Sequence, residues 1–376
     1  MLFAALFLLM LTGCATKQCP RVPVFFPPPP DEPRIQFLTG INSTDDIGDT
    51  TKKNQSTFSW IITGAEAPDI IKKLGKADGL TAYKGKLYIP EGMYARFSIV
   101  DPVKGTIEQP PGLQSKQGGL VYPVSIALDE EGYMYVADTG RKEIVVYDPA
   151  GNYARAFGRD IDPKSKIVGV AVHNGKLYAL DYGTSRIRVL DRKTGEQTAV
   201  LGYSEQPNQS IRSPYALTFD DAGNIYVTNI GNSKVMKYDL DGNFLGAFGG
   251  FGDIVGKFSK PKGIAVDDAG DIWVVDGGTN IVQVFNEQFH PLTFFGWPGL
   301  TCGSLNSPSG IVVTKDNLDY FRKYAVPGFQ VESLIFVVSQ FGQEFCIPRI
   351  TVYGLGRMES KAPETTGGKQ DAAPGK

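Results

Sequence analysis

Side chains with acceptor oxygens recur at one equivalent place in several similar segments of the sequence. Each ends a short apolar run and is followed two residues later by glycine; the four are Asp138, Asp181, Asn229 and Asp276. The first and last segments carry Glu91 and Ser339 at this place. An aspartate or asparagine before such a glycine commonly accepts backbone N–H groups in an Asx turn. The structural interpretation is therefore one turn repeated by symmetry.

The other interpretation of these side chains is functional. If the segments form a ring, their acidic ends make a ring of carboxylates near the mouth of a central channel. Basic residues follow several of them, so this face would carry the mixed charge that suits a protein partner. The candidate partner-binding residues are Asp138, Arg141, Lys142, Asp181, Arg186, Asn229, Lys234 and Asp276.

Other kinds of chemistry find little support in the sequence. The only two histidines, His173 and His290, argue against a multi-histidine metal site within one chain. No serine lies in a G-x-S-x-G nucleophile elbow. Lysine and arginine number 38 against 40 aspartates and glutamates, so no basic excess indicates nucleic acid. We therefore expect no nucleic-acid partner, no catalytic residue and no cofactor.

The elements that position these residues come from an internal repeat. Each copy holds short alternating runs separated by Gly, Asp or Asn turns, which is typical of a four-stranded antiparallel meander. The first strands begin at Leu80, Ile126, Val170, Leu217, Ile264 and Ile311. Six such sheets are marginal alone, but a radial arrangement buries both faces of each against its neighbours. The sequence thus predicts an all-β fold, a six-bladed β-propeller.

Two recurring residue types fit this radial arrangement. A small residue precedes each first strand, where six strands converge on the axis: Gly79, Ser125, Gly169, Ala216, Gly263 and Gly310. An aromatic residue occupies one place in each second strand and is expected to fill the wedge between blades: Tyr88, Tyr135, Tyr178, Tyr226, Trp273 and Phe336.

The last repeat lacks a fourth strand before the chain reaches its polar end. The segment "RIQFLTG", residues 34–40, ends in the same glycine as the fourth strands of other repeats. An isolated strand leaves its backbone groups unpaired, so we expect it to complete the last blade and close the ring. The alternative is a separate hairpin with residues around 58–62.

Residues 263–285, "GIAVDDAGDIWVVDGGTNIVQVF", and residues 220–249 closely resemble NHL repeats. The resemblance covers roughly residues 79–356 and implies a propeller fold without implying a function. The predicted lipid-anchored tether, the regular blades and the absence of a catalytic constellation favour a non-catalytic, lipid-anchored scaffold that presents its loop face to an envelope protein. By analogy alone, that partner would be a multihaem cytochrome or polysaccharide-export machinery.

Two enzymatic alternatives come from the same resemblance. Similar six-bladed rings host calcium-dependent lactonase-like hydrolases, and Glu91, Asn229 and Asp276 are the only set this sequence offers for that metal. An α-hydroxyglycine lyase would need several zinc-binding histidines, which two histidines do not supply.

The N-terminus predicts a lipoprotein. Residues 1–13 are apolar and precede "LTGC", which resembles the bacterial lipobox with Cys14 as the lipidated residue. Acyl chains on Cys14 would anchor the protein in the membrane, and Ala15 after it favours the outer membrane. Residues 14–32 are predicted to form a lipidated, Pro-rich tether, in which "FFPPPPDEP" from residue 25 should be extended polyproline II. Residues 33–357 are predicted to form the propeller and residues 358–376 a disordered tail.

Blade six carries two further features. Cys302 and Cys346 lie in loops that should emerge on the same face of the propeller, so a disulfide between them is plausible in an oxidising periplasm. The turn between its first and second strands is long, and residues 315–333 within it are either a functional loop or an insertion that packs on the surface.

Overall fold

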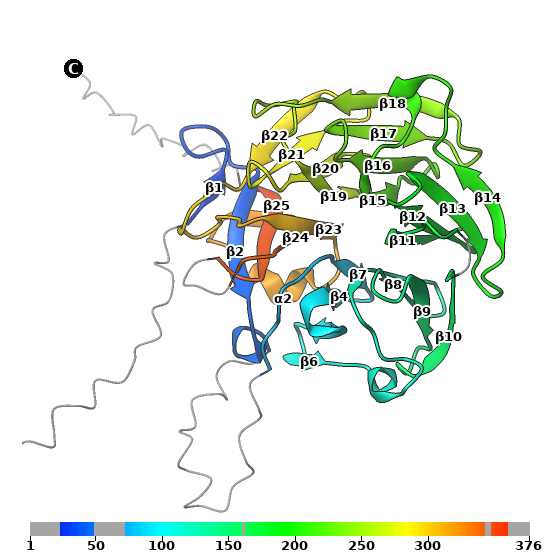
Figure 1. Ribbon diagram of the computed structural model, residues 1–376. Coiled ribbons are helices and arrows are strands. Elements are labelled where there is room, and N and C mark those ends of the chain that lie inside the picture. Colours follow the sequence, from blue (N-terminus) through cyan, green and yellow to red (C-terminus); the bar gives the residue numbers. More distant parts are fainter. Residues whose placement is uncertain (1–22, 49–71, 160–161, 343–346, 360–376) are drawn as a thin grey trace, which may run out of the picture.

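The computed structural model describes residues 23–48, 72–159, 162–342 and 347–359. Six antiparallel sheets are arranged around one axis in this part of the chain (Figure 1). The predicted all-β, six-bladed propeller is confirmed. Residues 1–22, which include the predicted signal segment and Cys14, lie outside the described residues, as do most of the C-terminal tail and residues 58–62.

The strands of the blades follow the predicted meander order. Blade one holds β3 (Thr81–Tyr83), β4 (Lys86–Glu91), β5 (Arg96–Asp101) and β6 (Thr106–Glu108). Blade two holds β7 (Pro123–Leu128), β8 (Met134–Asp138), β9 (Glu143–Tyr147) and β10 (Tyr153–Phe157), and blade three β11 (Ile167–His173), β12 (Lys176–Asp181), β13 (Arg186–Asp191) and β14 (Gln197–Leu201). Blade four holds β15 (Pro214–Phe219), β16 (Ile225–Asn229), β17 (Lys234–Tyr238) and β18 (Phe244–Gly249), and blade five β19 (Pro261–Val266), β20 (Ile272–Asp276), β21 (Ile281–Phe285) and β22 (Pro291–Phe295). Blade six holds β23 (Pro308–Thr314), β24 (Phe329–Ser339), β25 (Ile350–Met358), β2 (Ile35–Ile41) and β1 (Phe25–Phe26).

The first strands of successive blades contact one another around the axis, and β23 returns to β3. The small residues expected just before these strands lie inside them, except Gly79, which precedes β3. Their small size has a steric reason. A Cβ on Gly263 would lie 2.8 Å from the Cα of Gly310, and a Cβ on Gly310 would lie 3.0 Å from the backbone nitrogen of Leu80. Neighbouring first strands therefore approach too closely for a side chain there, as the sequence predicted.

The aromatic residues of the second strands fill the space between blades. All six are buried, and several also bond the aspartate of the preceding turn. The indole nitrogen of Trp273 donates to Asp267 Oδ2 at 2.9 Å, and the hydroxyl of Tyr135 donates to Asp129 Oδ2 at 3.0 Å. Each of these residues thus packs in the space between two blades and also stabilises the turn that precedes its own strand.

Strand β2 closes the ring by pairing antiparallel with β25. In this register Ile35 lies opposite Leu355, Phe37 opposite Tyr353 and Ile41 opposite Ile350. Ile35 and Ile41 are fully buried. The N-terminal strand therefore completes the last blade, as predicted, and joins the two ends of the described chain (Figure 1).

The predicted tether differs from the structure at its C-terminal end. Residues 25–26 form β1, which pairs with β2 and gives blade six a fifth strand. The ring of Phe26 lies 4.8 Å from that of Trp297, and the ring of Phe25 lies 5.8 Å from that of Phe329. Extended polyproline II over residues 25–32 is thus wrong, because two adjacent phenylalanines bury their rings on opposite sides of the last blade. At the other end, β25 runs to Met358, one residue past the predicted boundary.

The insertion in blade six folds onto the propeller. It contains α2 (Leu318–Arg322) and the first residues of the long strand β24. Phe321 is fully buried, and the hydroxyl of Tyr320 accepts a hydrogen bond from the amide of Gly48 at 2.8 Å. Residues 315–333 therefore pack between blade six and blade one, which supports the structural interpretation of this segment.

Candidate functional site

The predicted ring of acceptor side chains is buried. Asp138, Asp181, Asn229 and Asp276 are all fully inaccessible at the ends of their second strands. Each accepts backbone N–H groups from the connector that enters its own blade; Asp276, for example, accepts from Ser259 and Lys260, both at 2.8 Å. These residues fasten connectors to blades, and the acidic part of the predicted partner face does not lie on the surface.

Blade three adds a charged partner to this arrangement. Arg188 Nε donates to Asp181 Oδ2 at 2.8 Å, and both side chains are buried. Burial by itself raises the pKa of the Asp181 carboxyl, but hydrogen bonds from Thr184, the Lys166 amide and Arg188 outweigh it and hold the pKa below its ordinary value. No sequence pattern marks Arg188, because it lies in β13, an ordinary alternating strand.

The residues proposed for a calcium site are used in other ways. Glu91 accepts from Ser98 at 3.1 Å and pairs with Arg96 in blade one. Asn229 and Asp276 belong to blades four and five, where they bond their own connectors. Among the described residues, no three His, Cys, Asp or Glu side chains gather to hold a metal ion.

The basic members of the predicted face do reach the surface. They belong to what we call the loop face, made of the connectors that enter the first strands and the loops between second and third strands. Lys142 is exposed, while Arg141, Arg186 and Lys234 are partly buried. Arg141 donates to Glu143 and Arg186 lies over the ring of Tyr203. Because the acidic partners are buried, the charge presented here is predominantly positive.

The exposed charges of the loop face are strongly unequal. Its exposed cations among the described residues are Lys72, Lys73, Lys116, Lys142, Arg159, Lys164, Lys166, Arg212, Lys257 and Lys260. The exposed carboxylates there are Asp45, Glu205 and Asp253. On the opposite face, exposed acidic side chains occupy many turns: Glu130, Glu131, Asp221, Asp241, Asp268, Glu287, Asp316 and Asp319. That face also exposes cations, namely Lys84, Lys104, Lys176, Lys193, Lys315, Arg322 and Lys323. Its charge is therefore nearly balanced, and the excess of exposed positive charge lies on the loop face.

Large apolar side chains are also exposed on the loop face. Phe251 is 82% exposed and Ile254 67% in the connector into blade five, and Leu300 is 71% exposed in the connector into blade six. The others are Met93, Tyr94, Val121, Tyr122, Tyr182, Tyr203, Val255 and Phe341. These side chains make the loop face a candidate contact surface. Sequence reasoning missed it because these residues lie in irregular connectors without periodicity.

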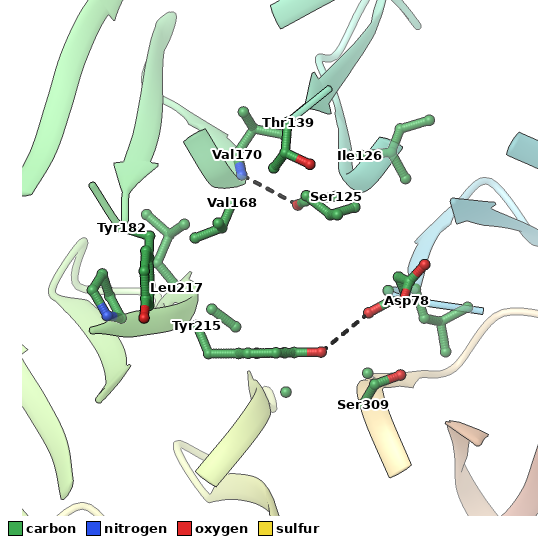
Figure 2. A pocket seen from close by; sticks show the side chains of 18 of the residues that line it. Asp78, Ser125, Ile126, Thr139, Val168, Val170, Tyr182, Tyr215, Leu217 and Ser309 are labelled. Atoms are coloured by element: carbon green, nitrogen blue, oxygen red, sulfur yellow. Dashed lines mark hydrogen bonds between the residues drawn. The ribbon is translucent and has the colours of Figure 1, made fainter. Parts of the chain in front are cut away.

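A cavity of about 440 Å³ opens at the loop-face end of the channel. Figure 2 shows its wall, with Tyr215 directed toward Asp78 and lying across from Ser125 and Thr139. The hydroxyl of Tyr215 lies 3.5 Å from the carbonyl oxygen of Asp78, and Gln340 Nε2 donates to Asp78 Oδ1 at 3.0 Å. Burial raises the pKa of the Asp78 carboxyl.

The cysteine predictions fall partly outside the described residues. Cys302 is buried in the connector that enters blade six, and Cys346 lies among residues 343–346, which are not described. The Cys302–Cys346 disulfide therefore stays a prediction. No helix in the described part of the chain is long and apolar enough to cross a bilayer.

Comparison with known proteins identifies the repeat and the fold. Residues 258–285 match the NHL repeat. A Bacteroides thetaiotaomicron structural-genomics protein of unknown function is similar at a TM-score of 0.55 and 17% identity, over 85% of this chain and 75% of that one. Kuenenia stuttgartiensis hydrazine synthase is similar at a TM-score of 0.50 and 12% identity, over 75% and 96% of the two chains. At these identities the similarity shows the fold alone. The protein is a six-bladed β-propeller that contains an NHL repeat.

Proposed function

We propose that this propeller is a non-catalytic binding module of the bacterial cell envelope that holds an acidic protein partner on its loop face. The observation that carries the proposal is the combination of exposed apolar side chains with exposed cations on one face. The exposed apolar residues supply contact area whose burial by a partner is favourable. The excess of exposed positive charge favours an acidic partner and speeds its association. The NHL propeller fold is consistent with a binding role.

Charge reversal on the loop face tests this proposal. In the triple variant Lys142→Glu, Arg212→Glu, Lys260→Glu, we expect photo-crosslinking from position 251 in intact cells to lose its heteromeric product. The triple variant should bind the partner recovered by that crosslink at least about tenfold more weakly than the original protein does. Added salt should weaken the binding of the original protein. Mass spectrometry of the product identifies the partner.

A matched variant reverses three cations of the opposite face, Lys84→Glu, Lys104→Glu and Lys193→Glu, which are also exposed. It should retain the crosslink. Equal loss in both triple variants, or a captured partner whose binding surface is basic, would contradict the proposed function.

The same proposal places the protein at the outer membrane through acyl chains on Cys14. Because β1 begins at Phe25, at most about 35 Å of chain separates Cys14 from the docked segment. The propeller would then lie close to the bilayer surface, with its blade-six edge nearest the anchor.

Replacing Cys14 by serine should remove the diacylglyceryl-modified N-terminal peptide and the protein from the outer-membrane fraction. The reason is that serine lacks the thiol that receives the lipid. Cys19→Ser is the matched control and should remain in that fraction, since it lies five residues further along the chain. Density-gradient fractionation with mass spectrometry of the N-terminal peptide provides the measurement. Retention of the Cys14→Ser protein in the outer-membrane fraction, or an N-terminal peptide of the original protein that lacks the lipid mass, would refute the anchor.

A further inference from the structure

The cavity at the loop-face end of the channel has two chemically distinct parts. Its inner wall comes from the first strands of all six blades and is largely apolar, with Leu80, Ile126, Val168, Leu217, Ile264 and Ile311. Its mouth carries polar and charged side chains from connectors and second-to-third-strand loops. At about 440 Å³ the cavity falls within the size range of small-molecule sites.

Positive charge predominates at this mouth. Lys76 and Lys166 line it, and Lys262 lies behind Gln340, with Nζ 3.2 Å from Gln340 Oε1. Lys262 is 4% exposed, and its burial, together with the nearby cations Lys260 and Lys76, lowers its pKa to about 8. Because this value is still above 7, the ammonium form of Lys262 predominates at neutral pH.

Asp78 is the only carboxylate among the described residues that line the cavity, and its oxygens are already engaged. Oδ2 accepts from the amide of Gly92 at 3.1 Å, and Oδ1 accepts from Gln340 at 3.0 Å. Lys76 Nζ lies 4.0 Å from the same Oδ1. The mouth thus combines one engaged carboxylate with two lining lysines, Lys76 and Lys166, and with Lys262 behind Gln340. A cationic ligand would therefore meet net repulsion and an anionic ligand net attraction.

Three tyrosines add flat surfaces beside these charges. Tyr122 and Tyr182 are exposed at the rim, and Tyr215 reaches across the cavity (Figure 2). We propose that the cavity binds a small organic anion with an aromatic or apolar body, its anionic group at Lys76 and Lys166 and its body along the first-strand wall. The cavity opens on the loop face and shares Lys166 with it, but the two proposals are tested separately, because the charge-reversal variant above changes neither Lys76 nor Lys166.

Calorimetric titration of the full-length protein in nanodiscs with 1-naphthaleneacetate, using empty nanodiscs as the reference, tests the site. We expect saturable one-site binding at millimolar or lower concentration, and at least about tenfold weaker binding of the neutral 1-naphthaleneacetamide. The double variant Lys76→Met, Lys166→Met should weaken naphthaleneacetate at least about tenfold, since it removes both cations from the lining. Val168→Phe places a larger side chain on the inner wall of the cavity, so it should abolish binding of both compounds.

Lys142→Met is the matched control, because it removes an exposed loop-face cation that does not line the cavity. It should change the affinity less than about twofold. Equal affinity for acid and amide, equal loss in Lys142→Met, or no saturable binding at millimolar concentration would overturn the proposal. If Val168→Phe fails to fold, the double lysine variant still decides. Loss of the naphthaleneacetate site with retained partner crosslinking would leave the proposed function intact.

Discussion

Replacing Ile35 by aspartate should destabilise the whole propeller by about 4 kcal/mol or more. Ile35 is fully buried in β2, where it lies opposite Leu355 and packs in the cluster that joins blades five and six. The substitution removes about 1.5–3 kcal/mol of apolar burial and in addition places a carboxylate where no partner exists. Because β2 pairs with β25 in the last blade, its release would also expose the edge of β25. Chemical denaturation followed by circular dichroism measures the effect.

Arg34→Asp is the control for this experiment. Arg34 precedes Ile35, its side chain is exposed, and its backbone makes the same strand contacts in both variants. Its denaturation midpoint should remain near that of the original protein. A synthetic peptide of residues 23–48 should partly restore the folded signal of the Ile35→Asp protein, since it can supply the missing strand in trans. Equal midpoints for the two variants would show that β2 is not part of the cooperative structure.

The parts of the fold that were predictable from sequence are those that symmetry repeats. The small first-strand residues, four of them glycine, and the second-strand aromatics each recur six times, so one physical reason accounts for every copy. Strand β2 was predictable because an incomplete blade has unpaired backbone groups and few segments can satisfy them. Strand β1 was not, because a two-residue strand before a proline run has no periodicity, and its stability comes from pairing with β2 and from ring contacts such as that of Phe26 with Trp297.

The candidate site was less predictable for a related reason. Asp138 and Asp276 were found by their spacing, yet spacing alone does not tell whether a side chain faces solvent or the connector of its own blade. The structure shows the connector, and the large apolar side chains that it exposes, such as Phe251 and Leu300, lie where no repeat marks them. Function in repeat folds is carried by what departs from the repeat. In this chain those departures are the irregular connectors and the excess of exposed cations on the loop face.

The Asp181–Arg188 pair provides the second large effect. Asp181→Asn should destabilise the protein by about 3–5 kcal/mol at neutral pH, because it leaves the buried guanidinium of Arg188 without its buried counter-charge. Asp162→Asn is a matched control, since Asp162 Oδ2 lies 3.6 Å from the same arginine but is 37% exposed. It should cost no more than about 1 kcal/mol. Urea denaturation of the two variants provides the comparison, and equal losses would contradict the importance of burial.

The pH dependence of this effect has a definite sign. The pKa of Asp181 is lowered on folding, so its stabilising contribution is present above the unfolded-state pKa of about 3.9 and is lost as the pH falls through the folded-state value. The difference in unfolding free energy between the original protein and Asp181→Asn should therefore be constant near neutral pH and shrink below about pH 4. Denaturation across this acid range measures it, and a difference that grows on acidification would contradict the assignment.

Blade four shows how the same position works without charge. There Asn229 takes the place of Asp181, and Met236 lies where blade three has Arg188, since Val227 faces Met236 just as Ala179 faces Arg188. The double variant Asp181→Asn, Arg188→Met converts one pair into the other. It should recover most of the stability lost by Asp181→Asn, because the uncompensated charge is then gone and an apolar side chain of similar length fills the space. If the double variant is as unstable as the single one, the loss comes from the connector hydrogen bonds of Asp181, and the ion pair is not its cause.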